Sequence, residues 1–321
     1  MKHVISIAPM MDWTDRHCRY FMRLLSPSAF LYTEMVTAAA VYHGDAERLL
    51  RYNEEEHPIA LQLGGSNPEW MASAVRKAAR FGYDEININV GCPSDRVQSG
   101  QFGACLMQQP QTVAECYKAM QAETDIPITV KTRIGIDDKD NDEFLQHFID
   151  VVAAEGCDKF IVHARIAILE GLSPKENRTI PPLNYERVYR LKRRFPELCI
   201  VMNGGLHEVK QVDDVLQCVD GVMIGRQAYH QPYFLAELTS HFSPGWPLPD
   251  RRDVVLAMLP YVESILAAGE PLHRVTRHML GLFAGQPGAR AWRRYISEHA
   301  HRPDAGVEVL TDALNAMPIA A

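Results

Sequence analysis

Apolar and β-branched residues gather in eight short runs along the first two thirds of the chain. The runs span residues 3–10, 31–35, 59–65, 85–92, 128–135, 159–165, 199–205 and 221–226. Most are separated by stretches at helical spacing, at 68–81, 110–123, 142–155, 185–195 and 208–218. This alternation over about 240 residues predicts an α/β fold, a (β/α)8 TIM barrel. The alternative, a doubly wound sheet, favours a glycine-rich turn after the first strand, and residues 8–15 contain no glycine.

The pattern changes after residue 242. Residues 243–250 contain three prolines, which deny backbone N–H groups to a continuing helix and indicate a linker. Beyond it, residues 254–268, 272–283, 289–299 and 307–316 all show helical spacing. We therefore expect a barrel domain over residues 1–244 and a small all-helical C-terminal domain over residues 245–321.

Composition is that of an ordinary globular protein, with 47% apolar and 23% charged residues. The seven cysteines include no CxxC pair, so the sequence indicates neither a disulfide framework nor a paired zinc motif, and we expect a reducing, cytoplasmic setting and no metal. Asp12 interrupts the apolar N-terminus, and no run of eighteen uncharged apolar residues occurs, which disfavours secretion and a membrane span.

Charge is distributed unevenly along the chain. The net charge of −7 disfavours a protein that coats nucleic acid, because phosphate neutralisation needs an excess of Lys and Arg. Residues 271–302, however, contain six arginines against one acid, Glu298. This segment is predicted to face an anion, although arginines on amphipathic helices are also commonly only solvated.

Polar residues and glycines end most of the apolar runs. In a (β/α)8 barrel the active site lies at the carboxyl ends of the strands, so these residues are predicted to converge at one mouth. They are Pro9, Met10, Met11, Asp12, Glu34, Gln62, Asn87, Asn89, Cys92, Lys131, Arg133, His163, Arg165, Asn203, Gly204, Gly205, Gly225 and Arg226.

The last two runs end in residues suited to a phosphate. Asn203, Gly204 and Gly205 follow the seventh run, and Gly225 and Arg226 follow the eighth. Bare backbone N–H groups and a guanidinium then lie where barrels commonly bind phosphate. The glycines alone would also suit tight turns, but their place after both final strands favours a phosphate site.

Two further residues at the mouth carry reactive groups. Lys131 could have one of three roles: a Schiff-base amine, a charge partner for an electron-rich cofactor ring, or a surface lysine at a strand end. The sequence leaves these alternatives open. Cys92 precedes Pro93 on a glycine-bearing loop and suits proton transfer or nucleophilic attack, whereas an inert buried thiol is the commoner role. Cys105 is the competing thiol on the same loop.

Motifs along essentially the whole chain resemble those of the flavin-dependent tRNA-dihydrouridine synthases. They are APMMDWTD at 8–15, EININVGCPSDRV at 85–97, VKTRIG at 130–135, VHAR at 162–165, NGG at 203–205 and GR at 225–226. Further segments are similar to the bacterial A-type subgroup, whose members reduce D-loop uridines 20 and 20a: GLSPKENR at 171–178, IPPL at 180–183, RHMLGLF at 277–283 and GARAWRRY at 288–295.

The resemblance implies a cofactor, a reductant and a mechanism. The backbone of Pro9, Met10 and Met11 would contact the isoalloxazine ring of FMN, together with Gln62 and Lys131. The FMN phosphate would lie on Asn203, Gly204, Gly205, Gly225 and Arg226, with His163 nearby. NADPH would reduce the flavin, its N5 would give hydride to uracil C6, and Cys92 would protonate C5. Asn89 would hold the uracil edge.

The resemblance also implies action on the D-loop of tRNA, and we expect a monomer because a macromolecular substrate must reach the barrel mouth. The residues implied to contact the RNA, besides Asn89, are Ser99, Lys175, Asn177, Arg178, Arg290, Arg293 and Arg294. One departure is that Ile166 and Ile168 stand where the subgroup carries Lys and Trp, which bears on RNA affinity or position preference. The alternatives are another FMN barrel oxidoreductase with a small substrate, an RNA-binding module without redox chemistry, and a Lys131 Schiff-base aldolase.

Overall fold

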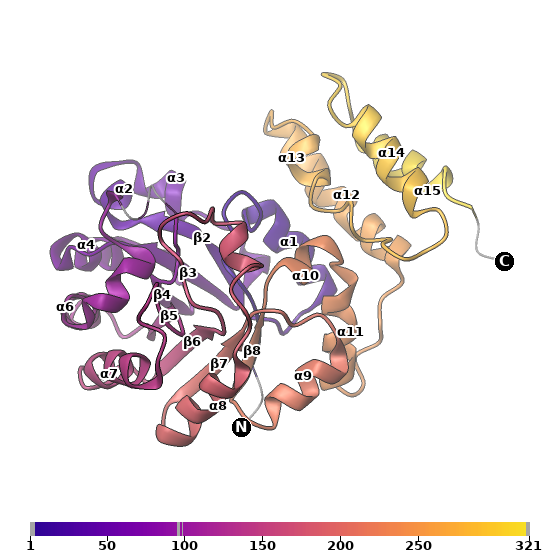
Figure 1. Ribbon diagram of the computed structural model, residues 1–321. Helices are drawn as coiled ribbons and strands as arrows, with labels where there is room; N and C mark the ends of the chain where they lie inside the picture. The colour runs from indigo at the N-terminus through magenta and orange to yellow at the C-terminus, as the bar shows by residue number, and fades with distance from the viewer. Residues whose placement is uncertain (1–3, 95–96, 98, 319–321) are drawn as a thin grey trace.

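The computed structural model describes residues 4–94, 97 and 99–318, and its core is a ring of eight parallel strands (Figure 1). The sheet runs in the order β1-β8-β7-β6-β5-β4-β3-β2, so consecutive strands from β2 to β8 pair with each other and β1 pairs with β8. The strands are β1 (Val4–Ile7), β2 (Leu31–Thr37), β3 (Ile59–Gly64), β4 (Glu85–Val90), β5 (Ile128–Arg133), β6 (Lys159–His163), β7 (Cys199–Asn203) and β8 (Gly221–Ile224). Each overlaps one of the eight predicted runs, and the expected (β/α)8 barrel is confirmed.

Hydrogen bonds close the ring between β1 and the residue before β2. The Phe30 N–H donates to the Ile5 carbonyl, and the Ile7 N–H donates to the Phe30 carbonyl, both at 2.9 Å. Closure leaves the C-terminal ends of the strands around a single mouth, which is where barrel active sites form.

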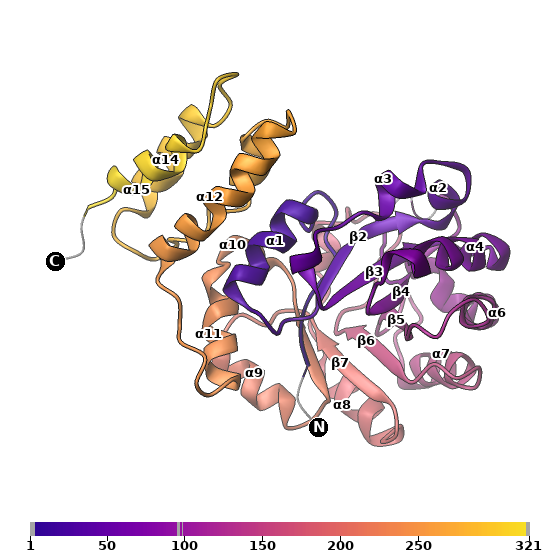
Figure 2. The ribbon, with the colours of Figure 1, turned by 180° about the vertical axis from the view of Figure 1, so that it is seen from behind.

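Helices cover the outside of the barrel (Figures 1 and 2). They are α1 (Arg16–Leu25), α2 (Ala38–His43), α3 (Ala46–Leu50), α4 (Pro68–Ala78), α6 (Pro110–Gln121), α7 (Asp142–Ala153), α8 (Tyr185–Arg194), α9 (Val209–Leu216), α10 (Arg226–His230) and α11 (Tyr233–Phe242). Side-chain caps fix where several begin: the Asn141 carbonyl oxygen accepts the Phe144 N–H at 2.8 Å, and Asn184 accepts the Arg187 N–H at 3.0 Å.

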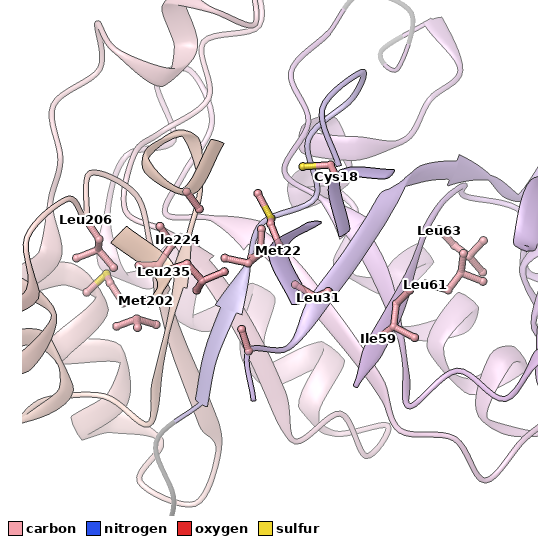
Figure 3. Packing of buried hydrophobic residues seen from close by; sticks show 14 of the residues in the cluster. Cys18, Met22, Leu31, Ile59, Leu61, Leu63, Met202, Leu206, Ile224 and Leu235 are labelled. Atoms are coloured by element: carbon pink, nitrogen blue, oxygen red, sulfur yellow. The ribbon is translucent and has the colours of Figure 1, made fainter. Parts of the chain in front are cut away.

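Alternation along each strand separates two packed regions. Leu61 and Leu63 of β3 point outward into the layer between strands and helices, where Met22 of α1 and Leu235 of α11 also pack (Figure 3). The intervening positions face the barrel interior. A small apolar cluster fills part of that interior, made of Ala8, Met10, Tyr32, Ala60, Ile161, Val201 and Met223. Polar side chains from β3, β4 and β5 fill another part, which matters for the site.

Four further helices lie beside the barrel, next to α1, α10 and α11 (Figures 1 and 2). They are α12 (Arg251–Ala267), α13 (His273–Thr276), α14 (Ala289–His299) and α15 (Glu308–Asn315). The stretch that joins α11 to α12 contains neither helix nor strand, as the prolines predict. The division into domains at residue 244 stays a prediction. In the described part of the chain, no helix is long and apolar enough to cross a membrane.

The predicted helix over residues 272–283 is wrong beyond Thr276. The chain continues there as hydrogen-bonded turns, in which the Leu282 N–H donates to Met279 and the Ala284 N–H to Gly281. Gly281 packs against α10 so closely that a Cβ would lie 2.3 Å from the His230 carbonyl oxygen. This approach between distant segments overrides the helical spacing of the local sequence.

Candidate active site at the barrel mouth

A cavity of about 620 Å³ opens at the C-terminal ends of the strands. The segments that follow five strands, β1, β4, β6, β7 and β8, line it, and β2, β3 and β5 contribute residues from within the strands. The predicted site residues that line it are Pro9, Met10, Met11, Gln62, Asn89, Cys92, Lys131, His163, Arg178, Asn203, Gly204, Gly205, Gly225 and Arg226. The structure thus brings together the whole predicted cofactor set, Cys92 and two of the residues implied to contact RNA.

Hydrogen bonds hold the segment after β1 against the cavity. The Met10 N–H donates to Thr14 Oγ1 at 2.9 Å, and the Asp12 N–H donates to Glu34 Oε1 at 2.5 Å. Asp12 adopts a left-handed φ of 64°, which turns the chain so that Met11 is 55% exposed at the rim. Glu34, predicted to belong to the mouth, therefore fixes the conformation of this segment.

The segments after β7 and β8 form a cradle of glycines, and the turn after β7 fits only glycine. Gly204 and Gly205 have φ values of 114° and 72°, in the left-handed region. A Cβ on Gly204 would lie 2.6 Å from His163 Cδ2, and one on Gly205 would lie 2.3 Å from Leu183 Cδ1. The missing side chains leave backbone N–H groups open beside Arg226, an arrangement that fits a phosphate.

Basic side chains crowd the same wall of the cavity. The lining includes Lys131, Arg133, His163, Arg178 and Arg226, and the charge of Arg165, outside the lining, acts on His163. Within the described part of the chain, none of them forms an ion pair with a carboxylate. Carbonyl oxygens are the partners instead: Lys131 Nζ donates to Asn203 Oδ1 at 3.0 Å, and Arg133 Nε donates to the Gly91 carbonyl at 2.8 Å. The buried Nε of Arg178 has no protein partner.

This crowding lowers the basicity of the groups involved. Burial, followed by the charge of Arg133, lowers the pKa of Lys131 to about 7. Burial likewise lowers the pKa of Arg133 to about 10, and that of His163 falls well below its usual value. An anionic, phosphate-bearing ligand would offset this repulsion, so the donor set and the orphaned Arg178 Nε fit FMN.

Cys92 lies on the turn that follows β4 and is half-buried at the cavity. Its N–H donates to Asn89 Oδ1 at 3.0 Å, and its carbonyl accepts the Ala104 N–H at 2.9 Å. Gly103 makes this approach possible, because a Cβ there would lie 2.6 Å from the Cys92 oxygen. The thiol lies 3.5 Å from Ser94 Oγ. Backbone contacts on both sides therefore fix where the sulfur stands.

Cys105, the competing thiol, has a different environment. Its Sγ donates to the Phe102 carbonyl at 3.1 Å, and burial raises its pKa. It lies outside the described lining of the cavity, so Cys92 is the thiol placed for chemistry at the mouth.

The remaining residues implied to contact RNA fall in three places. Ser99 is exposed on the loop that follows Cys92, and Lys175 is exposed near Arg178 on the loop after β6. Arg290, Arg293 and Arg294 are exposed on α14, which both ribbon views place on the far side of α12 from the barrel (Figures 1 and 2). A ligand that touches both α14 and the cavity must therefore be large.

Asn177 requires a correction, because its side chain is fully buried. Its Nδ2 donates to the Ile168 carbonyl at 2.7 Å, and its Oδ1 accepts the Ile168 N–H at 2.8 Å. Asn177 therefore holds the loop that carries Lys175 and Arg178 and has no surface to offer to RNA. Ile168 takes part in this loop through its backbone, and Ile166 packs half-buried against the core.

Sequence reasoning missed several residues of the lining. Met35, Ser94, His207 and Gln227 contribute to the cavity wall. Each lies within a few residues of a predicted strand end, so position along the chain is the available signal.

Comparisons with known proteins agree with this geometry. A family model described as dihydrouridine synthase matches residues 6–317. A tRNA-dihydrouridine(20/20a) synthase of Shewanella oneidensis is 59% identical over 311 residues, covering 97% of this chain and 92% of the relative. Proteins of the same name from Vibrio vulnificus and Escherichia coli K12 are 57% and 58% identical, covering 98% and 96% of this chain and 97% and 90% of their own lengths.

A solved structure supports the fold alone. A 2-naphthoyl-CoA reductase in complex with 2-naphthoyl-CoA aligns with a TM-score of 0.59 over 74% of this chain and 50% of its own, at 11% identity. The family match, by contrast, extends through the barrel, the cavity residues and the C-terminal helices. The chain belongs to the dihydrouridine synthase family.

Proposed function

We propose that this protein reduces uridine to 5,6-dihydrouridine at positions 20 and 20a of the tRNA D-loop, with FMN as cofactor and NADPH as reductant. The observation that carries the proposal is one cavity lined by Cys92, by the glycine cradle and by basic side chains that form no ion pair with a carboxylate among the described residues. The names of the relatives, which match along nearly their whole lengths, supply the substrate. The protein would act as a monomer in the cytoplasm.

The cavity residues divide into a ring site and a phosphate site for FMN. The backbone of Pro9, Met10 and Met11 would contact the ring, with Gln62 and Lys131. The phosphate would be held by Asn203, Gly204, Gly205, Gly225 and Arg226, with His163 beside it. Once reduced by NADPH, the bound flavin supplies the hydride that adds to uracil C6.

Cys92 supplies the proton that completes the reduction. The C5–C6 double bond gains a hydride at C6 and a proton at C5, and the thiol that donates the proton becomes a thiolate. The negative charge of that thiolate opposes the burial that lowers the pKa values of Lys131, Arg133 and Arg178, so these three groups in turn stabilise it. Solvent then returns a proton to the sulfur before the next cycle.

Residues at the edge of the cavity and on α14 would bind the RNA backbone. Arg178 lines the cavity, Lys175 lies on the same loop after β6, and Ser99 lies on the Cys92 loop. Arg290, Arg293 and Arg294 present a second basic surface on α14. Two separate contacts would orient a folded tRNA so that one D-loop base, flipped out of its stack, enters the mouth.

An absorption spectrum of the purified protein tests the cofactor and the substrate together. We expect flavin bands between about 300 and 550 nm that bleach with NADPH and return with unmodified tRNA. Fully modified tRNA is the matched control and should leave the flavin reduced. Bands that return with a small substrate and not with tRNA would contradict the proposal, as would a protein that remains colourless after incubation with FMN.

A further inference from the structure

Polar side chains form a connected line through the barrel interior, beginning at the turn that holds Cys92. The N–H groups of Gly91 and Cys92 donate to Asn89 Oδ1 at 3.1 and 3.0 Å. Asn89 Nδ2 then donates to Gln62 Oε1, and Gln62 Nε2 donates to Asn87 Oδ1, both at 2.8 Å. Two side chains of the cavity wall are thus linked to a third beneath them.

The line continues to a buried carboxylate. Asn87 Nδ2 donates to Thr129 Oγ1 at 2.8 Å, and the Thr129 hydroxyl donates to Glu85 Oε1 at 2.7 Å. The Tyr32 hydroxyl donates to the same oxygen, and Lys159 Nζ pairs with Glu85 Oε2 at 2.6 Å. Glu85, Asn87 and Thr129 are each at most 3% exposed, so water does not compete for these bonds.

Every bond in this line points the same way, toward Glu85. Amide and hydroxyl side chains both donate and accept, so an isolated chain of them has two possible directions. Here the ends remove that choice, because backbone N–H groups only donate and a carboxylate paired with an ammonium only accepts. Burial and the Glu85 charge raise the pKa of Tyr32 well above its usual value, so its hydroxyl stays a donor.

We propose that Glu85, Thr129 and Asn87 are positioning residues that impose one direction on this hydrogen-bond relay and thereby fix the Cys92 turn and the amide of Asn89. The relay is defined as Glu85, Thr129, Asn87, Gln62 and Asn89. The inference deepens the proposed function and rests on it where it concerns uracil.

The direction has a consequence for what Asn89 recognises. Its carbonyl oxygen accepts two N–H groups, which uses both lone pairs, and one of its own N–H groups goes to Gln62. Asn89 is therefore left with a single N–H for a ligand. It recognises a carbonyl oxygen of the uracil edge and cannot accept from N3–H.

A variant in the middle of the relay tests the role without touching the cavity. Thr129→Val removes the hydroxyl at nearly constant volume. We expect the single-turnover rate of tRNA reduction by the NADPH-reduced, FMN-bound enzyme to fall about tenfold or more, with tRNA affinity unchanged, because Cys92 is misplaced. Thr129→Ser restores the hydroxyl and should restore the rate.

Thr132→Val is the matched control. Thr132 lies on the same strand and is equally buried, but its hydroxyl makes only bonds of 3.4 Å to the Val90 and Arg133 carbonyls. This variant should keep the wild-type rate. An equal loss in both valine variants would mean that any buried hydroxyl on β5 matters, which contradicts the relay.

A second readout is independent of turnover and of RNA. Peptide mass spectrometry follows the alkylation of Cys92 by iodoacetamide, with Cys105 as the internal reference. We expect Thr129→Val and Glu85→Gln to speed Cys92 alkylation about threefold or more, because the turn loses its anchor. The side-chain amide introduced by Glu85→Gln can donate to Thr129 and so reverse the direction of the relay. If Thr129→Val does not fold, the alkylation rate of Glu85→Gln alone therefore tests the relay.

The outcomes are distinguishable. Wild-type alkylation and wild-type reduction rates in the folded variants would overturn the relay. A wild-type protein that never reduces tRNA, while Cys92 alkylation still responds to Glu85→Gln, would overturn the proposed function and leave the positioning role intact.

Discussion

At the residue scale, Lys131 carries a marked electrostatic conflict. It lies two residues before the end of β5, half-buried near Arg133 and without a carboxylate partner in the described part of the chain, so burial and the Arg133 charge lower its pKa from 10.5 to about 7. At neutral pH the fraction of Lys131 that is protonated then depends chiefly on the charge of the group that binds in the cavity. An anionic cofactor or the Cys92 thiolate would favour the ammonium, which links ligand binding to the charge of this residue.

The shifted pKa predicts a pH dependence of folding. Between pH 7 and pH 10.5 the unfolded chain keeps a proton on Lys131 that the folded protein releases, so this residue makes stability rise with pH over that window. We expect the Tm of FMN-free protein to gain more between pH 7 and about pH 9 in the wild type than in Lys131→Met. Parallel curves for the two proteins would refute the assignment.

At the scale of elements, the segment after β7 shows how backbone shape makes a binding site. Gly204 needs a left-handed φ and also the space that His163 occupies. Gly204→Ala should therefore weaken FMN binding about tenfold or more, as measured by flavin fluorescence. Gly245→Ala is the control, because its φ of 95° imposes the same backbone strain but its Cβ would meet nothing within 4 Å. Equal FMN affinity in both variants would argue against a steric role for the cradle.

The elements also show what a sequence can and cannot predict. The eight strands follow from local patterns, because each run alternates between the interior and the helix layer. The relay was not predictable, since Gln62, Asn87 and Thr129 lie on three strands and meet only when the sheet closes. The prediction for Asn177 fails for a similar reason. The residue type does not show that the Asn177 side-chain amide bonds to the backbone of Ile168 and is therefore unable to bind RNA.

At the scale of the whole molecule, the C-terminal helices dock on α1 through Asp15. Arg277 pairs with Asp15 Oδ2 at 2.5 Å, and His278, whose side chain is fully buried, lies 3.0 Å from Asp15 Oδ1. Burial alone would raise the pKa of Asp15, but His278, the Cys18 N–H and Arg277 hold it well below its usual range. Its stabilising charge is present above the unfolded pKa of about 3.9 and is lost as the pH falls below that value.

Removing this charge should loosen the attachment of the C-terminal helices. Asp15→Asn is expected to cost about 3 kcal/mol in the free energy of unfolding, because Arg277 and the buried His278 ring lose their charged partner. Asp213→Asn breaks a comparable carboxylate–histidine pair, with His241, that is about four-tenths exposed, and should cost less than about 1 kcal/mol. Equal losses in urea titrations would contradict a buried docking contact.

The role of the basic surface of α14 also depends on the whole molecule. This surface would contact RNA only if a tRNA reaches from α14 to the cavity at the barrel mouth. Arg293→Ala should reduce the slope of log affinity for tRNA against log salt by about one unit. Arg80→Ala, an exposed arginine on the barrel 3.9 Å from Glu47, should leave the slope unchanged. Unchanged slopes in both variants would remove α14 from the RNA contact.

The most direct test of the whole account is mass spectrometry of unmodified tRNA after incubation with the protein, FMN and NADPH. The account predicts a gain of two hydrogen atoms on uridine at positions 20 and 20a, a loss of about a hundredfold or more in rate for Cys92→Ala, and full activity for Cys105→Ala. A tRNA that gains no mass, or a Cys92→Ala variant that works at the wild-type rate, would contradict it.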